Sequence, residues 1–276
     1  MKAVCPICPH RCALEPGQLG LCRARRNVHG AVTCENYGRL TSLALDPIEK
    51  KPLRRFHPGS LILSAGSYGC NLRCPFCQNY EISMEGPEAE TVFLTPEELT
   101  AKALALSQAP PGNLGVAFTY NEPLVGYEYV KDCAALLHQK GLKTVLVTNG
   151  MICLEPLEAL LPQVDAMNID LKAFSRDGYR RLGGDLETVK GTIARSVGRC
   201  HVEVTTLIVP GENDSEDEMD AEAGWLASLD PELPLHISRF FPRFQMTDRE
   251  PTPTKTMNAL IQTARQHLRY VYSGNC

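Results

Sequence analysis

Six apolar runs rich in β-forming residues, with helix-like segments between them, constrain the fold of this chain more than any other feature. They cover residues 61–65, 114–118, 143–147, 166–171, 202–209 and 235–240. Most are continuous rather than alternating, which is typical of strands buried on both faces. Strand–helix alternation indicates a parallel sheet with right-handed crossovers, so we expect an α/β fold.

The helical segments carry recognisable start and stop signals. Thr95 and Ser215 each stand three residues before a glutamate, the pattern of a capping box, and predict helices to about residues 107 and 229. Gly141 is placed to stop a helix over 125–140, and 254–268 is expected to form the last long helix.

The number of strands decides between a closed and an open barrel. A complete eight-unit barrel typically needs ~250 residues. Fewer than that follow residue 60, and six strands are clear. We therefore expect a partial (β/α)6 barrel over 61–276, preceded by a small cysteine-rich module over 1–60, where five cysteines and several turn formers occur with little periodicity.

Composition excludes several classes of protein. No stretch of ~18 apolar residues predicts a membrane span, and the first residues lack the apolar core of a secretion signal. A cytoplasmic location is expected, so the twelve cysteines should be reduced thiols, used for metal or buried. The net charge of −4 argues against bulk binding to nucleic acid or anionic lipid, although residues 1–60 alone carry +6.

Three closely spaced cysteines follow the first predicted strand. Cys70, Cys74 and Cys77 lie in the run Gly-Cys-Asn-Leu-Arg-Cys-Pro-Phe-Cys-Gln-Asn. Iron–sulfur clusters normally take four cysteines, so three thiolates would leave one iron without a protein ligand. The alternative is a zinc knuckle built on Cys74 and Cys77, with Cys70 as a bystander.

Polar residues also follow the other predicted strands. They are Thr119 to Pro123, Thr148 to Gly150, Asp170 with Lys172, and Val209 to Asp214, and His236 and Arg239 lie in the last strand. Ligands bind at the carboxyl ends of parallel strands, so we expect these residues to share one site with the three-cysteine loop.

The cysteine spacing resembles the radical S-adenosylmethionine (SAM) family, in particular the branch that contains the pyruvate formate-lyase activating enzyme. The resemblance implies a [4Fe–4S] cluster on Cys70, Cys74 and Cys77, whose open iron is chelated by SAM. It maps the family's contact to the SAM amino group onto Asn121 and Glu122. The family's later motifs map onto Asp170, Leu171 and Lys172, and onto Pro234 and His236.

The groups of SAM suggest individual contacts. Glu122 would accept from its ammonium, and Lys172 would offset its carboxylate. Thr148 and Asn149 would bond the ribose, while Phe76 and the corner at Val209 and Pro210 offer apolar surface to adenine.

The chain departs from the family pattern at three points. The Gly-Gly-Glu of the family is Tyr120-Asn121-Glu122 here, and Val147 replaces an aspartate that helps to bind a cation, which makes a cation site doubtful. No cysteine lies between Cys77 and Cys133, so the ferredoxin-like insert of many glycyl-radical activators is absent from this sequence.

The implied chemistry is reductive cleavage of SAM to a 5′-deoxyadenosyl radical, which takes a hydrogen atom from a substrate. His236 and Arg239 are candidate contacts to substrate or SAM, although His236 also fits a hydrogen-bonded core residue. Cys276, the last residue, is a further candidate as a ligand or hydrogen-atom donor.

A second set of cysteines lies near the N-terminus. Cys5, Cys8, Cys12 and Cys22 fall within eighteen residues and predict a zinc site, a second [4Fe–4S] cluster, or no metal, with Cys34 as a spare ligand. Three other cysteines are expected in the core: Cys133, Cys153 and Cys200.

Three functions remain open from the sequence. The first is a radical SAM enzyme acting on a small molecule or peptide, and the second is an activase that acts on a glycyl-radical partner protein. Both would need an external electron donor such as flavodoxin or ferredoxin. The third, a cysteine-rich electron carrier or metal-regulated binding protein, has no need of a barrel with polar strand ends.

Overall fold

The computed structural model describes residues 1–275 and contains a large sheet and three small two-stranded sheets. The strands are β1 (Ala3–Val4), β2 (Ala13–Leu14), β3 (Arg25–Val28), β4 (Ala31–Cys34), β5 (Arg39–Leu40), β6 (Ser42–Pro47), β7 (Leu61–Gly66), β8 (Val92–Phe93), β9 (Gly115–Phe118), β10 (Lys143–Thr148), β11 (Ala166–Asp170), β12 (His201–Ile208), β13 (Leu235–Arg239) and β14 (Val271–Gly274).

Helices connect these strands. The α-helices are α1 (Tyr80–Ser83), α2 (Pro96–Ser107), α3 (Tyr127–Gln139), α4 (Leu154–Leu160), α5 (Arg176–Arg181), α6 (Leu186–Ser196), α7 (Glu216–Leu229) and α8 (Thr254–Ala264), with 3₁₀ turns η1 (Ile48–Lys50), η2 (Pro123–Gly126) and η3 (Leu161–Gln163). Among the described residues, no helix has both the length and the apolar character needed to cross a membrane.

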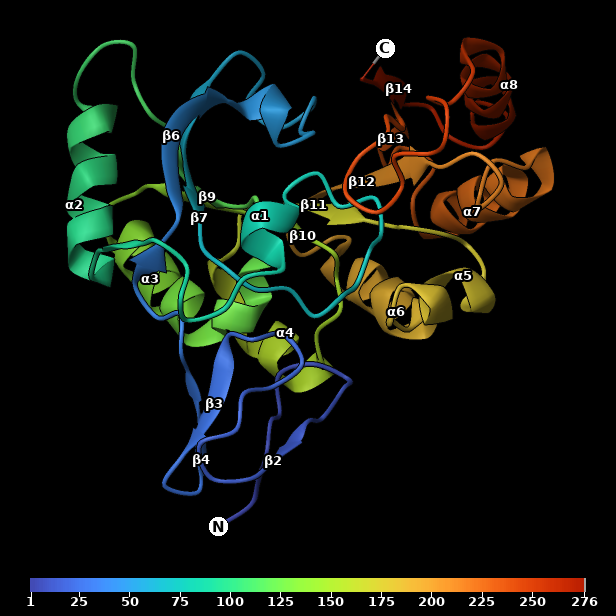
Figure 1. The fold of residues 1–276 in the computed structure, drawn as a ribbon. Helices are drawn as coiled ribbons and strands as arrows, with labels where there is room; N and C mark the ends of the chain where they lie inside the picture. The colour runs from blue at the N-terminus through green and yellow to red at the C-terminus, as the bar shows by residue number, and fades with distance from the viewer. Residues whose placement is uncertain (276) are drawn as a thin grey trace.

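The large sheet has the strand order β14-β13-β12-β11-β10-β9-β7-β6, and all of its neighbours run parallel except β6 and β7. The six predicted strands are its central six, which confirms the α/β, mostly parallel fold. The two edge strands, β6 and β14, were not predicted. The sheet is curved, with α2 to α8 on its outer side and α1 near the open side (Figure 1).

Helix boundaries follow the capping signals in part. Thr95 caps α2 with a complete capping box, as expected. Ser215 accepts from the Glu218 backbone N–H at the start of α7, but the Glu218 carboxylate instead accepts from the Phe174 backbone N–H at 2.6 Å. The last helix, α8, ends at Ala264 rather than at residue 268.

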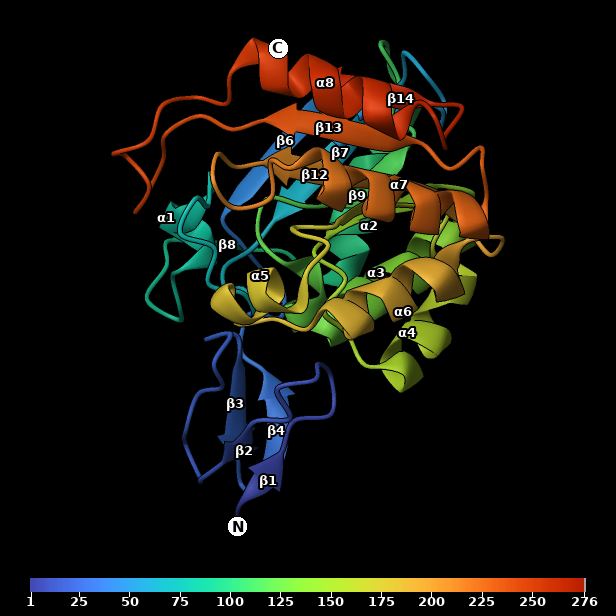
Figure 2. The same ribbon diagram turned by 90° about the vertical axis from the view of Figure 1, so that its right-hand side faces the viewer.

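The first four strands form two hairpins that project from one end of the molecule (Figures 1 and 2). The guanidinium of Arg25 on β3 is buried and donates to both carboxylate oxygens of Glu128 on α3, at 2.7 and 2.6 Å. The backbone N–H of Cys153 donates to the Ile7 carbonyl at 2.8 Å. These contacts fasten the hairpins to the helical layer.

Residues 42–47 form β6 of the large sheet, and residues 52–55 form hydrogen bonds with side chains of β11 and β12. β6 pairs along its whole length with β7. Two side chains of the large sheet bind the backbone that follows β6. Asn168 donates to the Pro52 carbonyl, and Glu203 accepts from the N–H groups of Arg54 and Arg55. Residues 42–55, which the sequence analysis assigns to the N-terminal module, therefore have contacts with the large sheet.

Candidate active site

A cavity of about 350 Å³ opens at the carboxyl ends of the parallel strands. It is lined by residues from the loops after β7, β9, β10 and β11, which gathers most of the predicted site. Among its lining residues are Cys70, Cys74, Phe76, Cys77, Asn121, Glu122, Asn149, Asp170 and Lys172.

The three cysteines lie on the loop between β7 and α1. Cys74 is buried, and Cys70 and Cys77 are half-buried. Burial raises the pKa of the Cys74 thiol to about 11 and also raises that of Cys70. Because burial disfavours bare thiolates, these sulfurs are suited to bonding a cationic centre rather than to standing free.

Glu122 is the central carboxylate of the cavity. Its Oε1 accepts from the Thr148 hydroxyl at 2.7 Å and the Leu124 backbone N–H at 3.0 Å, and its Oε2 accepts from the Asn149 backbone N–H at 2.7 Å. Burial raises the pKa of Glu122 to about 7, against the lowering effect of these donors. Oε2 keeps a lone pair for one further donor in the cavity.

Asp170 and Lys172 form an ion pair beside the cysteines, with Nζ 2.8 Å from Oδ2. Burial acts to lower the pKa of Lys172, but Asp170 and the Cys74 thiol outweigh it and raise that pKa. Lys172 is therefore a stable cation, placed where it offsets negative charge on the cysteine loop.

The Asn121 side chain forms hydrogen bonds with the backbone that leads into the cysteine loop. Its Oδ1 accepts from the Ser67 N–H, and its Nδ2 lies within hydrogen-bond distance of the Tyr68 and Gly69 carbonyls. An amide in this position ties the end of β7 to the end of β9. Asn121 thus binds the backbone of residues 67–69, at a position where the family pattern has a glycine.

Other predicted site residues do not line the cavity. Thr148 contacts Glu122 without lining the cavity, and Val209 is buried away from it. The His236 ring is buried, with Nε2 2.6 Å from Glu203 Oε2, and Arg239 donates through Nε to the Thr252 carbonyl. His236 thus has the core-type environment that the sequence analysis left open. Cys276 lies outside the described residues.

Sequence reasoning missed a polar cluster at the β6 side of the cavity. The buried Nζ of Lys51 lies 3.0 Å from Asp46 Oδ2 and 4.6 Å from the centre of the Tyr120 ring, and the Tyr120 hydroxyl donates to Asp46 at 2.6 Å. Tyr120 adopts a φ of 75°. Pairing of β6 with β7 brings Asp46 and Lys51 to Tyr120, and no local signal marked Asp46 or Lys51.

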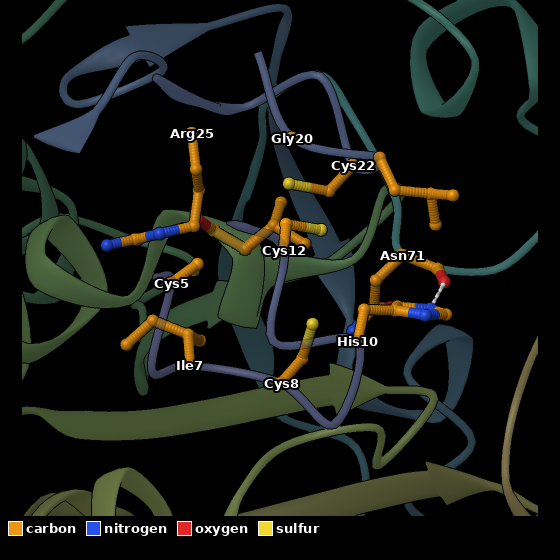
Figure 3. Close-up of a pocket in the computed structure, with 11 residues that line it drawn as sticks. Cys5, Ile7, Cys8, His10, Cys12, Gly20, Cys22, Arg25 and Asn71 are labelled. Atoms are coloured by element: carbon orange, nitrogen blue, oxygen red, sulfur yellow. Dashed lines mark hydrogen bonds between the residues drawn. The ribbon is translucent and has the colours of Figure 1, made fainter. Parts of the chain in front are cut away.

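The four N-terminal cysteines surround a second, much smaller space (Figure 3). Cys5, Cys8 and Cys22 are buried and Cys12 is half-buried. Burial raises the pKa of Cys8 to about 12. Within residues 1–275, no three His, Cys, Asp or Glu side chains lie close enough together to share one metal ion.

The remaining cysteines differ in burial. Cys133 lies fully in the core, as predicted, whereas Cys153 and Cys200 are partly exposed because they lie at the start of α4 and just before β12. The Cys34 thiol donates to Asn36 Oδ1 at 3.1 Å.

Comparisons of the sequence with known proteins find relatives in one family. The model of the Radical SAM superfamily matches residues 65–223, more than half of the chain. The uncharacterized protein MJ0808 of Methanocaldococcus jannaschii is 41% identical over 99% of this chain and 81% of its own length. The pyruvate formate-lyase-activating enzyme of Clostridium pasteurianum is 29% identical over 55% of this chain and 63% of its own length.

Solved structures show the same fold. A radical SAM methyltransferase from Sphaerobacter thermophilus superposes with a TM-score of 0.58 over 79% of this chain and 67% of its own, at 20% identity. With the family match, the near full-length relative and the three-cysteine loop in one cavity with Glu122 and Lys172, this chain belongs to the radical SAM superfamily.

Proposed function

We propose that this protein is a radical SAM enzyme that abstracts a hydrogen atom from a small-molecule or peptide substrate. Superfamily membership implies a [4Fe–4S] cluster and SAM. The observation that supports this proposal is that Cys70, Cys74 and Cys77 line one cavity with the buried carboxylate of Glu122 and the partly buried cation of Lys172. When bound, the cluster would supply one electron to split SAM into methionine and a 5′-deoxyadenosyl radical.

The residues present fit these groups. Three thiols from one loop leave one corner of a cubane for SAM, in keeping with the donor set of the family. Glu122 Oε2 would accept from the SAM ammonium, and Lys172 would balance its carboxylate. Asn149 lies beside both Cys70 and Glu122, and Phe76 offers the cavity an apolar ring.

Two roles proposed from sequence are reassigned. Thr148 would act through Glu122, because its hydroxyl donates to that carboxylate. His236 would act as a positioning residue, since its contact with Glu203 helps to hold the carboxylate that binds residues 54 and 55.

The test is anaerobic reconstitution followed by a SAM-cleavage assay. On reduction, the protein should release 5′-deoxyadenosine and carry at least about four irons. Replacing Cys70, Cys74 and Cys77 together by Ala should abolish cleavage, whereas Cys133→Ala, a core cysteine remote from the cavity, should not. Cleavage that survives the triple replacement would refute the assignment.

A second candidate is a glycyl-radical activase. It is favoured by the similarity to proteins named pyruvate formate-lyase-activating enzyme and putative glycyl-radical enzyme activating enzyme, each 29% identical over 55% of this chain. The two functions differ in the location of the product radical. A lasting glycyl EPR signal in an added partner protein would favour the activase.

We also propose that Cys5, Cys8, Cys12 and Cys22 hold a second metal centre, either zinc or a further [4Fe–4S] cluster. Three of these thiols are buried around one space, which supports a shared ligand. An external donor such as flavodoxin or ferredoxin would supply the electrons.

A further inference from the structure

One lysine on the wall of the cavity has no part in the proposed binding of SAM. Only 2% of the Lys51 side chain is exposed, yet Lys51 lines the same cavity as the cysteine loop. Its Nζ lies 4.6 Å from the centre of the Tyr120 ring. Tyr120 directly precedes Asn121 and Glu122 in the chain. Lys51 therefore lies within one side chain of the proposed SAM site, where a substrate would have to bind.

The contacts of Lys51 leave its amino group only partly engaged. Nζ donates to Asp46 Oδ2 at 3.0 Å, and the ammonium lies over the Tyr120 ring. In the part of the chain that the structure describes, no other acceptor lies within hydrogen-bond distance of Nζ. A lysine ammonium has three N–H groups, so at least one remains for a group in the cavity.

Asp46 is shared among three donors, which weakens its hold on any one of them. Its Oδ1 accepts from Lys50 Nζ at 3.1 Å, and its Oδ2 accepts from both Lys51 Nζ and, at 2.6 Å, the Tyr120 hydroxyl. Burial and the hydrogen bond to Asp46 raise the pKa of Tyr120 to about 12, so this hydroxyl is a neutral donor. The cluster therefore carries two positive charges against one negative charge.

Lys51 has the environment that makes an amine a nucleophile. Burial lowers the pKa of Lys51, and the positive charge of Lys50 acts in the same direction, whereas Asp46 acts to raise it. Removal from water and a neighbouring cation are two conditions that activate lysines which attack carbonyl groups. Lys51 meets both conditions, and a carboxylate and a hydroxyl are fixed beside it.

The backbone conformation at Tyr120 sets the position of its ring. Tyr120 has a φ of 75°, in a left-handed region that residues other than glycine rarely adopt and that is found disproportionately at functional sites. The end of β7 makes room for the ring, because a Cβ added at Gly66 would lie 2.7 Å from Tyr120 Cδ2. The contact between Tyr120 and Lys51 therefore depends on a strained residue and on a glycine that accommodates it.

We propose that Lys51 forms a Schiff base with the carbonyl group of the substrate, and that this substrate is a small 2-oxo acid. The proposal rests on the proposed function and names its substrate class. The acidic group of the substrate would lie near Lys50, which also lines the cavity and whose side chain is 66% exposed. The excess of positive charge in the cluster favours such an anion over an uncharged carbonyl compound.

The condensation balances without any further reactant. A bond forms between Lys51 Nζ and the carbonyl carbon, the carbon–oxygen double bond breaks, and the oxygen leaves as water with two hydrogens of the ammonium. The product is an iminium cation, so the positive charge beside Asp46 is kept. No electron is gained or lost. A covalent bond of this kind would hold the carbon skeleton of the substrate beside the proposed SAM site in a fixed orientation.

Imine trapping tests the proposal on the full-length, anaerobically reconstituted protein. Glyoxylate, the smallest 2-oxo acid, is added with sodium cyanoborohydride, whose hydride reduces an imine to a stable secondary amine. Peptide mapping by mass spectrometry should place the adduct at Lys51 before the exposed Lys50 and Lys255 react. Modification of the exposed lysines with Lys51 left intact would overturn the proposal and make Lys51 a structural ion-pair partner.

A pair of variants tests whether the adduct depends on the Lys51 amine. Lys51→Arg keeps a positive charge beside Asp46 but cannot form an imine, so the adduct should be lost. Lys255→Arg, on α8, is the matched control and should leave the adduct at Lys51 unchanged. An adduct of equal yield in Lys51→Arg would overturn the proposal. The map of the wild type decides the same question if the variant does not fold.

A second carbonyl compound tests the substrate class. Acetaldehyde lacks the acidic group, so the preference for Lys51 over Lys255 should be smaller with acetaldehyde than with glyoxylate. Equal preference would overturn the choice of an acidic carbonyl substrate. Trapping does not require SAM cleavage, so failure here is distinguishable from failure of the proposed enzyme function.

Discussion

Glu122 shows how a single residue prepares the cavity for a cationic ligand. Three donors hold its carboxylate, and burial still raises its pKa to about 7. A positive group that arrives at Oε2 would favour the ionised form, and this is the environment that a SAM ammonium would provide.

Glu122→Gln should weaken SAM binding without loss of the first cluster. A hydrogen bond to a charged group contributes about 1.5–3 kcal/mol, so we expect the Kd for SAM to rise by roughly tenfold or more. Equilibrium binding to the reconstituted protein, with iron content as the check on folding, measures this. An unchanged Kd would remove Glu122 from the SAM site.

Glu222 on α7 is a second buried carboxyl, remote from the cavity lining. It is 1% exposed, and the Thr206 hydroxyl donates to it. Burial raises its pKa from 4.5 to about 8, so the folded protein binds this proton more tightly than the unfolded chain. The contribution to stability is complete below about pH 4.5 and is lost as the pH rises to about 8.

Glu222→Gln should therefore be more stable than the wild type at pH 8 and should lack this part of the pH dependence. The wild-type slope from this group is at most about 1.4 kcal/mol per pH unit. Urea unfolding between pH 5 and 8 measures it, with the exposed Glu216→Gln on the same helix as a control. Parallel pH curves for wild type and Glu222→Gln would contradict the expectation.

Single residues also show where sequence reasoning succeeds. Glu122, Asp170 and Lys172 lie at or just after the carboxyl ends of buried strands, so a parallel sheet brings them to one edge whatever the details of packing. Asp46 and Lys51 were missed because a long-range strand pairing brings them to the cavity. For His236 the decisive partner is Glu203, inside a strand where sequence predicts only an apolar run.

At the scale of elements, β3 and α3 are joined by one buried ion pair. The Arg25 side chain is 3% exposed, whereas that of Glu128 is 41% exposed. Loss of the carboxylate would leave a buried charge without its partner, while loss of the guanidinium would leave a carboxylate that water can reach.

Glu128→Ala should destabilise the protein by about 3 kcal/mol, which is more than the partial exposure of the Glu128 side chain suggests. Arg25→Met should cost less, and the double variant should recover part of the loss because no unpaired charge remains. Urea midpoints under reducing conditions compare the three. A larger loss for Arg25→Met than for Glu128→Ala would contradict this account.

The two edge strands show why element prediction stops short. The central strands are continuous apolar runs, as burial on both faces requires. β6 has exposed and half-buried residues and contains Asp46 and Pro47, and β14 has four residues of mixed burial. Edge strands need less apolar sequence, so their pattern is not distinguishable from that of loops.

Across the whole molecule, positive charge is concentrated in the first sixty residues, which carry +6 against −10 in the remainder. Arg11 is exposed beside Cys12, the least buried of the four clustered N-terminal cysteines. An acidic electron carrier would be steered towards this end by charges that salt screens within about 10 Å at 0.1 M.

The rate at which flavodoxin reduces the reconstituted protein should accordingly fall as ionic strength increases. Arg11→Gln should also lower this rate at low salt. Stopped-flow absorbance at low and high salt measures both effects. Lys255→Gln, on α8 near the opposite end of the molecule, is the matched control and should leave the rate unchanged. A rate insensitive to salt would contradict steering by this surface.

The large sheet ends at β6 on one side and β14 on the other, and these two strands do not pair with each other. Lys50 and Lys51, just after β6, and Asn275, just after β14, line the same cavity. Arg54 and Arg55 lie over the rings of Tyr272 and Tyr270, so the segment after β6 bridges the gap between the two edge strands. Access to the cavity is therefore expected over the carboxyl ends of the strands, where residues from both edges of the sheet border its mouth.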